Sequence, residues 1–142
     1  MSSIDRYSDS LGVISLAPAV VSDNTTQVGL IIDTQCFHAL TFFTSIGAIA
    51  DADATFTFSI EDGDDAALSD AAPVDADKYL LGTLADMSFT QANANSVRQI
   101  GYVGVRRYVR ATYTIALNTG DANFGQMADL ERPRVAPTKS NV

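Results

Sequence analysis

The stretch IGYVGVRRYVRATYTIAL, residues 100–117, decides the fold class of this chain. From residue 103 onward its apolar and polar residues alternate with period two, which is typical of a strand with one buried face. The pattern predicts one long half-buried β-strand, or two strands joined near Gly104. We expect a turn or bulge at Gly104, because it would keep Arg107 out of the core. The expected buried side holds Val103, Val105, Val109, Ala111, Tyr113, Ile115 and Leu117, and the outer side holds Tyr102, Arg106, Tyr108, Arg110, Thr112 and Thr114.

Shorter strands are expected on both sides of this stretch. The runs that predict them are bounded by turn residues and cover 11–21, 26–32, 37–49, 54–60, 84–90 and 124–130. One helical turn is expected over 75–81, but no regular alternation of helices and strands suggests a parallel sheet. The sequence therefore predicts an all-β fold, a single antiparallel β-sandwich of jelly-roll type over residues 11–130. Residues 1–10 are expected to form an N-terminal arm and residues 131–142 an extended C-terminal tail.

Three segments carry more specific expectations. Val28, Leu30 and Ile32 should share one face of their strand. The more continuous run 37–49 predicts a central strand covered on both faces, with a short helix as the competing interpretation. Residues 118–121, Asn-Thr-Gly-Asp, are typical of a hairpin turn.

The charge of the chain is negative and unevenly spread. Nine lysines and arginines against seventeen aspartates and glutamates give a formal net charge of −8. Residues 51–86 hold ten acids and one base, whereas residues 98–142 hold seven bases and three acids. Either the two segments pair inside one domain, or the molecule has a negative end and a positive end suited to lattice contacts. Net negative charge repels nucleic acid, so we expect no nucleic-acid partner.

The only positive cluster lies in and beside the opening stretch. Its arginines are Arg98, Arg106, Arg107 and Arg110, with Tyr102 and Tyr108 among them. Tyrosine and arginine together can stack on a single-stranded nucleic acid, but the net charge argues against that partner. Arginines that lie over tyrosine rings and pair with the acidic segment, or that contact a protein, fit the composition better. We therefore name six candidate protein-contact residues: Tyr102, Arg106, Tyr108, Arg110, Arg132 and Arg134.

The chain has few of the residues that catalytic and metal-binding sites use. It has one cysteine, Cys36, and one histidine, His38. A nucleophile–base pair or a zinc site needs further partners, so we expect Cys36 to be a small buried hydrophobe and His38 to be structural. The acidic segment 61–77 does not match the spaced EF-hand pattern and is expected to be a solvated loop, with cation binding left open. We expect no enzyme, no metal site and no cofactor.

Targeting and membrane segments are not expected from the sequence. Residues 1–10 lack the apolar centre of a signal peptide, and no run approaches about 18 apolar residues. We therefore expect a protein that is made in a cytoplasm and has no membrane partner.

The chain, mainly in its C-terminal half, resembles a group of tailed-bacteriophage virion proteins. The motifs are an alternating strand that runs into an acidic Gly-containing segment, a polar linker with a basic residue, Ile-Gly-Tyr-Val-Gly, Arg-Tyr-Val-Arg, and a basic tail with proline. Here they occupy 56–65, 93–98, 100–104, 107–110 and 132–137. Arg-Tyr-Val-Arg also occurs in galactose-binding-like jelly rolls. The Gly-His-Pro-Arg usual near the end of that group is replaced here by Leu-Glu-Arg-Pro-Arg, residues 130–134.

The resemblance implies a capsid decoration, or cement, protein. Such proteins sit on the outer capsid and tie neighbouring major capsid subunits together, so the implied role is to bind and stabilise the phage head. The implied location is the capsid surface of the virion, after synthesis in the host cytoplasm. The implied partners are the major capsid protein and further copies of this chain, in a trimer or another symmetric cluster. The alternatives are a carbohydrate-binding jelly-roll adhesion module and a structural protein of the tail or head–tail junction.

Overall fold

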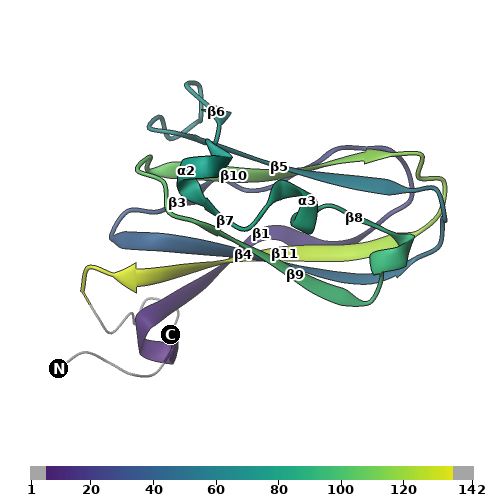
Figure 1. Cartoon of the computed structure of the whole chain (residues 1–142), viewed down its shortest axis with the longest axis horizontal. Coiled ribbons are helices and arrows are strands. Elements are labelled where there is room, and N and C mark those ends of the chain that lie inside the picture. Colours follow the sequence, from purple (N-terminus) through teal and green to yellow (C-terminus); the bar gives the residue numbers. More distant parts are fainter. Residues whose placement is uncertain (1–5, 136–142) are drawn as a thin grey trace.

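Two antiparallel β-sheets pack face to face in the computed structural model, which describes residues 6–135 (Figure 1). The first, sheet A, has the strand order β1-β11-β4-β9-β7. Its strands are β1 (Ser10–Val21), β11 (Ala122–Pro133), β4 (Phe37–Ile49), β9 (Ser96–Tyr102) and β7 (Leu80–Leu81). The second, sheet B, has the order β2-β10-β5-β6, with β3 also on β10 and β8 also on β5. Its strands are β2 (Gln27–Val28), β10 (Tyr108–Ala116), β5 (Thr55–Gly63), β6 (Ala72–Pro73), β3 (Ile32–Asp33) and β8 (Phe89–Thr90).

Short helices lie at the ends and open edges of the sandwich. They are α1 (Arg6–Asp9), α2 (Ala76–Tyr79), α3 (Leu84–Met87) and the 3₁₀ turn η1 (Gln91–Asn93). Asp75 and Thr83 are the N-caps of α2 and α3, and their side chains accept hydrogen bonds from first-turn amides. Helix α3 contacts β9 of sheet A and β5 of sheet B, and its Met87 is fully buried, so it closes one edge between the sheets (Figure 1). The helical turn expected over 75–81 is confirmed, and the strand expected over 84–90 is wrong for its first half, where α3 forms.

The chain changes sheet at most of its connections. β1, β4, β9 and β11 lie in sheet A, and the strands β2, β3, β5 and β10 that come between them lie in sheet B. The first and last strands, β1 and β11, are neighbours and pair antiparallel from Ser10 to Val21. This winding is that of a jelly roll. The predicted antiparallel β-sandwich of jelly-roll type is therefore confirmed.

The stretch 100–117 contains two strands in different sheets. β9 ends in sheet A at Tyr102, β10 begins in sheet B at Tyr108, and residues 103–107 cross between them. The break lies where the two-strand alternative places it. A Cβ at Gly104 would clash with the Tyr102 ring, so only glycine allows the chain to pass this close. Arg107 is exposed in the connection, as expected.

Because the chain changes sheet at residues 103–107, the alternation of buried and exposed residues does not continue from β9 into β10. Alternate residues of β10 are buried as expected, namely Val109, Ala111, Tyr113 and Ile115. The prediction is wrong for Val103, Val105 and Leu117, which are exposed because they lie in the connections on either side of β10. It is also wrong for Tyr102, which is buried because it belongs to β9 and follows the inward phase of sheet A.

Strand boundaries follow the sequence more closely than connections do. β4 covers the predicted run 37–49 from end to end, and its inward residues Leu40, Phe42, Thr44 and Ile46 are buried. Its outward side is not fully covered, since Ser45 is exposed, so the expectation of two buried faces is wrong. Residues 118–121 join β10 of sheet B to β11 of sheet A, so the predicted hairpin is also wrong.

The run 26–32 forms two short strands, β2 and β3, with a break between them. Ile32 is buried but Val28 and Leu30 are exposed, so the expected common face is wrong. The amide of Gly29 donates to a carbonyl of β10 in sheet B, and the next amide, that of Leu30, donates to a carbonyl of β1 in sheet A. Neighbouring amides that bond to different sheets cannot continue one flat ladder.

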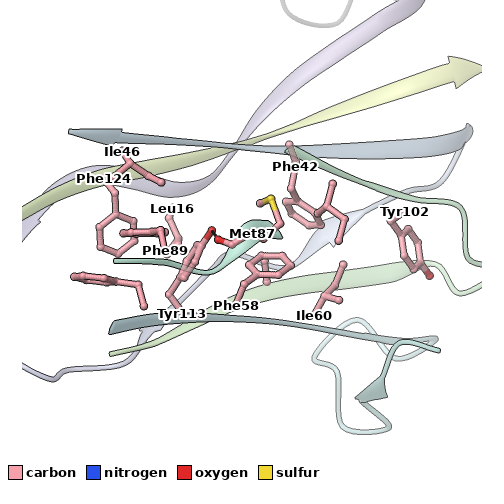
Figure 2. Packing of buried hydrophobic residues seen from close by; sticks show 14 of the residues in the cluster. Leu16, Phe42, Ile46, Phe58, Ile60, Met87, Phe89, Tyr102, Tyr113 and Phe124 are labelled. Atoms are coloured by element: carbon pink, nitrogen blue, oxygen red, sulfur yellow. Dashed lines mark hydrogen bonds between the residues drawn. The ribbon is translucent and has the colours of Figure 1, made fainter. Parts of the chain in front are cut away.

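Aromatic rings fill the space between the sheets. In Figure 2 Phe124 and Phe42 of sheet A point toward Tyr113 and Phe58 of sheet B, and Phe89 lies beside them. The Phe124 ring centroid is 5.4 Å from that of Tyr113 and 5.5 Å from that of Phe89, both edge to face. Phe42 and Phe58 meet at 6.3 Å in the same arrangement. Such edge-to-face pairs add to the stability that burial alone supplies.

A chain of buried hydrogen bonds crosses this core. Ser15 Oγ donates to Gln126 Oε1 at 2.8 Å, and Gln126 Nε2 donates to Thr44 Oγ1 at 3.0 Å. The Thr44 and Tyr113 hydroxyls bond at 2.9 Å, and the Tyr113 hydroxyl donates to the Met87 carbonyl at 2.9 Å. Burial raises the pKa of Tyr113 well above its usual range, so the phenol stays a donor. This series of hydrogen bonds links β1, β11 and β4 of sheet A to β10 of sheet B and to α3.

The expected terminal arms are described only in part. Arg6–Asp9 form α1, Ser10 begins β1, and β11 continues to Pro133. The inner ends of both segments therefore belong to regular structure. Residues 1–5 and 136–142, the rest of the expected arm and tail, lie outside the described residues.

Candidate functional site

Tyr102 is part of the core rather than of a contact surface. It is 2% exposed, and its hydroxyl donates to Asp62 Oδ2 at 2.7 Å. Burial, followed by the bond to Asp62, raises the pKa of this phenol far above its usual range. Because Tyr102 lies in β9 and Asp62 in β5, the bond joins the two sheets.

Two arginines of the basic cluster, Arg106 and Arg110, pair with carboxylates of the acidic segment. Arg106 lies 3.2 Å from Asp64 and 3.5 Å from Asp70. Arg110 Nε donates to Glu61 Oε1 at 2.7 Å. The two segments lie side by side because β5 and β10 are paired neighbours. Pairing inside one domain is confirmed, and the interpretation with separate negative and positive ends is wrong for these residues.

Arg107 makes a two-pronged ion pair and stacks on a tyrosine. Its Nε and one terminal nitrogen donate to the two oxygens of Asp33, each at 2.9 Å, and the terminal nitrogen also donates to Gln35 at 2.6 Å. The guanidinium lies over the Tyr108 ring, 5.0 Å from its centroid. The bond from Arg107 lowers the pKa of Asp33. An arginine over a tyrosine ring is confirmed here, so one face of Tyr108 is already occupied.

Arg132 and Arg134 lie where β11 ends. Both are exposed, and Arg134 lines a pocket of about 530 Å³ with Arg106 and His38. The Arg134 amide donates to the Cys36 carbonyl at 2.8 Å, which fixes the end of β11 to the turn before β4. The fold thus brings two of the six candidate residues into one pocket at this end. Their contact with a partner stays a prediction.

Cys36 and His38 are both exposed. Cys36 is a free thiol with φ +73° in the turn before β4, so its expected burial is wrong. A residue in this left-handed conformation reverses the chain direction, and such turns lie at the surface. Across residues 6–135 no group of three or more His, Cys, Asp or Glu could hold a metal ion. Within the same range no helix is long and apolar enough to cross a membrane.

The outer face of sheet A carries an apolar groove of about 740 Å³, here called the sheet A groove. Its walls and floor include Ile14, Pro18, Val20, Phe43, Ser45, Val97, Gly125 and Met127. Four of these side chains are well exposed: Val97 at 67%, Val20 at 58%, Ile14 at 49% and Met127 at 43%. None of the fourteen lining residues is charged. A contiguous exposed apolar surface of this kind marks an interaction site.

Strand register explains the shape of the groove. Ile14, Met127 and Phe43 are direct cross-strand neighbours on β1, β11 and β4, and they form an apolar ridge. Two residues further along the same face, Gly125 pairs with Ser45. These small residues form a hollow beside the ridge, and Val97, which pairs with Ser45, stands at its β9 end. At its β1 end the hollow is bounded by Pro18, since a Cβ on Gly125 would lie 2.9 Å from the Pro18 Cα.

Helix α1 stands at the other side of the ridge. Its Arg6 forms ion pairs with Asp129 and with Glu131, the latter at 3.3 Å. The Arg6 guanidinium also lies 5.8 Å from the centroid of the Phe43 ring. These residues border a shallower pocket that shares Phe43 and Met127 with the sheet A groove. The apolar surface therefore ends at a group in which positive and negative charges are already paired.

Sequence reasoning missed the sheet A groove. Its side chains come from β1, β4, β9 and β11, which are far apart in the sequence. Alternation shows which residues of one strand share a face, but only the register between strands shows that Met127 stands between Ile14 and Phe43. The available signal was an apolar residue in the outward phase of a strand, such as Phe43 or Met127.

Comparisons with known proteins place the chain at a distance from all of them. No family model matches it, and no curated protein matches its sequence. Among solved structures, the SPBc2 prophage-derived protein YomS is similar at 12% identity and a TM-score of 0.43, over 85% of this chain and 93% of that one. The Clostridium thermocellum endo-1,4-β-D-xylanase 10B, as CBM22-1–GH10 modules complexed with xylohexaose, gives 10% identity and a TM-score of 0.37. That match covers 96% of this chain and 28% of the xylanase chain, and similarity at this level supports no inference about function.

Proposed function

We propose that this protein is a structural component of a tailed-bacteriophage particle, a capsid decoration protein that binds the major capsid protein and stabilises the head. It would act by binding alone, without catalysis. The observation that carries the proposal is the apolar, uncharged sheet A groove, whose side chains Val97 and Val20 are 67% and 58% exposed. A surface of that kind is suited to contact with another protein subunit, as the assembly of a particle requires.

The motifs behind the phage resemblance support a structural role for that end of the molecule. Residues 56–65 lie in and after β5, and residues 107–110 lead into β10 beside it. Their charged side chains meet each other, as in the pair between Glu61 and Arg110. The charged residues of these two motifs therefore hold the sandwich together locally, and the exposed residues outside these ion pairs are left for a partner.

Arg132, Arg134 and Tyr108 are the candidate residues that best suit a capsid contact. Arg132 and Arg134 are exposed, and Tyr108 is partly so. Arginine and tyrosine are enriched at protein interfaces because they combine apolar area with hydrogen bonding. We include the two ends of the chain, residues 1–5 and 136–142, in the proposed capsid contact.

Head stability tests this function. Heads from a phage that lacks the gene should break at lower temperature and milder osmotic shock than wild-type heads, and added purified protein should restore their resistance. Arg132→Ala/Arg134→Ala protein should restore less, whereas Val28→Ala, which alters an exposed residue on sheet B, should restore fully. Heads that are equally resistant with and without the protein would refute the stabilising role. Immunogold labelling at the tail would instead support the alternative role, a structural protein of the tail or head–tail junction.

A further inference from the structure

We propose that two copies of this chain associate through the outer face of sheet A, about a two-fold axis, with the ridge of each copy in the hollow of the other. The ridge is Ile14, Met127 and Phe43, and the hollow is centred on Gly125 and Ser45. The inference rests on the proposed binding role of this face and names its occupant, a second copy. Three properties of the face lead to it: its charge, its shape and its size.

The charge of this face is compatible with a second copy. The chain carries a net charge of −8, so two copies repel each other wherever acidic surfaces meet. A two-fold interface also brings each surface against itself, which penalises any unpaired charge near the axis. The sheet A groove has no charged lining residue. At its border Arg6 already pairs with Asp129 and Glu131.

The shape of the face is complementary to itself. A ridge of large apolar side chains and a hollow of small residues lie side by side, two residues apart along the same strands. Rotation by half a turn about an axis between them places the ridge of one copy over the hollow of the other. In this arrangement Phe43 of one copy would face Ser45 of the second copy, and Met127 would face Gly125. Val97 at the end of the hollow would lose its exposure to water.

The size of the face is what a specific dimer needs. The face is made of β1 with 12 residues, β11 with 12, β4 with 13 and β9 with 7. At about 3.3 Å per residue and about 4.8 Å between strands, these strands cover about 700 Å². Specific interfaces of ordinary size bury about 800 Å² on each partner. The face of sheet A is therefore large enough without any contribution from sheet B.

Sedimentation velocity of the purified full chain over a wide concentration range tests the dimer. The wild type should form dimers, and Val97→Lys and Met127→Lys should each raise the dimer dissociation constant by at least about 30-fold, because each buries an unpaired charge twice. Val28→Lys is the matched control, since Val28 is a 54% exposed valine on a strand of sheet B. It should leave dimerisation unchanged. Thermal unfolding followed by circular dichroism checks that all variants are folded.

A mixing experiment tests the ridge-in-hollow geometry itself. Phe43→Lys and Ser45→Asp chains should each dimerise poorly alone, because each buries charges without a partner of opposite sign. A mixture of the two should associate at least about tenfold more tightly than either alone, because the ammonium introduced by Phe43→Lys in one chain then faces the carboxylate introduced by Ser45→Asp in the other. A mixture no tighter than its components would overturn the geometry.

The outcomes separate this inference from the proposed function. A monomeric wild type, a stoichiometry other than two, or dimers that survive Val97→Lys and Met127→Lys would each overturn the inference. Monomers whose binding to phage heads is abolished by Met127→Lys would assign the sheet A groove to the capsid and reject the second copy. Groove-dependent dimers that neither bind nor stabilise heads would leave the inference intact and reject the decoration role.

Discussion

Two buried tyrosine hydroxyls join the sheets at the scale of single residues. Tyr102 of sheet A donates to Asp62 of sheet B, and Tyr113 of sheet B bonds to Thr44 of sheet A. Each phenol is enclosed by the core, and burial raises the pKa of both. A buried hydroxyl with a partner costs little, whereas a partner left without its donor is expensive. Neither ring can therefore be exchanged for phenylalanine without consequence.

These raised pKa values predict an alkaline loss of stability. Above about pH 10 a tyrosine in the unfolded chain loses its proton while the buried one keeps it, so the free energy of unfolding falls as the pH rises, by about 1.4 kcal/mol per pH unit for each such tyrosine. Tyr102→Phe should lower stability at neutral pH by about 1–3 kcal/mol and give a shallower fall above pH 10. Urea unfolding across this pH range measures both effects.

Tyr7→Phe is the control for this experiment, because it removes the hydroxyl of a side chain that is 63% exposed. Parallel curves for the wild type and Tyr102→Phe above pH 10 would contradict the assignment.

At the scale of elements, the strands of sheet A present two different surfaces. The edge of the sheet at β1 is interrupted by Pro18 and by irregular pairing between Ile14 and Ala19, which discourages another strand from adding there. The inner side of β1 instead contributes Ser15 to the hydrogen-bond chain that continues through Gln126 and Thr44. The outer side supplies part of the ridge. The edge of sheet A at β1 is thus less suited than its outer face to the association proposed above.

The hydrogen-bond chain should depend on its middle member. Thr44→Val keeps the shape of the side chain but removes the hydroxyl that accepts from Gln126 and bonds to Tyr113. We expect a loss of about 1–3 kcal/mol in the free energy of unfolding, because buried polar groups on both sheets lose a partner. Urea unfolding at neutral pH measures it.

Thr57→Val on β5 provides the comparison for Thr44→Val, since Thr57 is exposed and its replacement should change stability by less than about 0.5 kcal/mol. Equal losses at the two positions would show that the buried hydrogen bonds of Thr44 contribute nothing of their own to stability.

At the scale of the whole molecule, several of the positive charges are paired with nearby carboxylates, and an excess of negative charge remains. The arginines beside β10 are paired with carboxylates, as Arg106 is with Asp64. The net charge of −8 remains and spreads a repulsive field around the molecule. Association must then take place on a surface without charge, or after screening. The sheet A groove satisfies the first condition.

Salt should therefore strengthen the proposed dimer. Raising the ionic strength from about 0.02 M to about 0.3 M shortens the Debye length and screens the repulsion between two acidic copies. The dimer dissociation constant, measured by sedimentation, should fall along this series. Val97→Lys should stay monomeric throughout and controls for nonspecific association. A dimer that weakens with salt would show that ion pairs, rather than apolar contact, hold it together.

Much of the fold could be predicted from the order of residues. β4 coincides with the predicted run 37–49, and the buried phase of β10 follows from alternation, because both depend on local periodicity. The break near Gly104 was also predicted, because a glycine at this position favours a turn or bulge. What periodicity could not supply was the change of sheet at residues 103–107, which reversed the expected side of Tyr102 and exposed Val105.

The sequence by itself determined the fold class, the acidic balance of the chain and the opposite charges of its two segments, since these depend on composition and period. Only the tertiary structure decided which surfaces are free. It paired Arg106 and Arg110 with the acidic segment, left Cys36 exposed, and set Ile14, Met127 and Phe43 in one row. The physical reason is register: hydrogen bonding between strands distant in the sequence fixes which side chains become neighbours, and no local pattern encodes it.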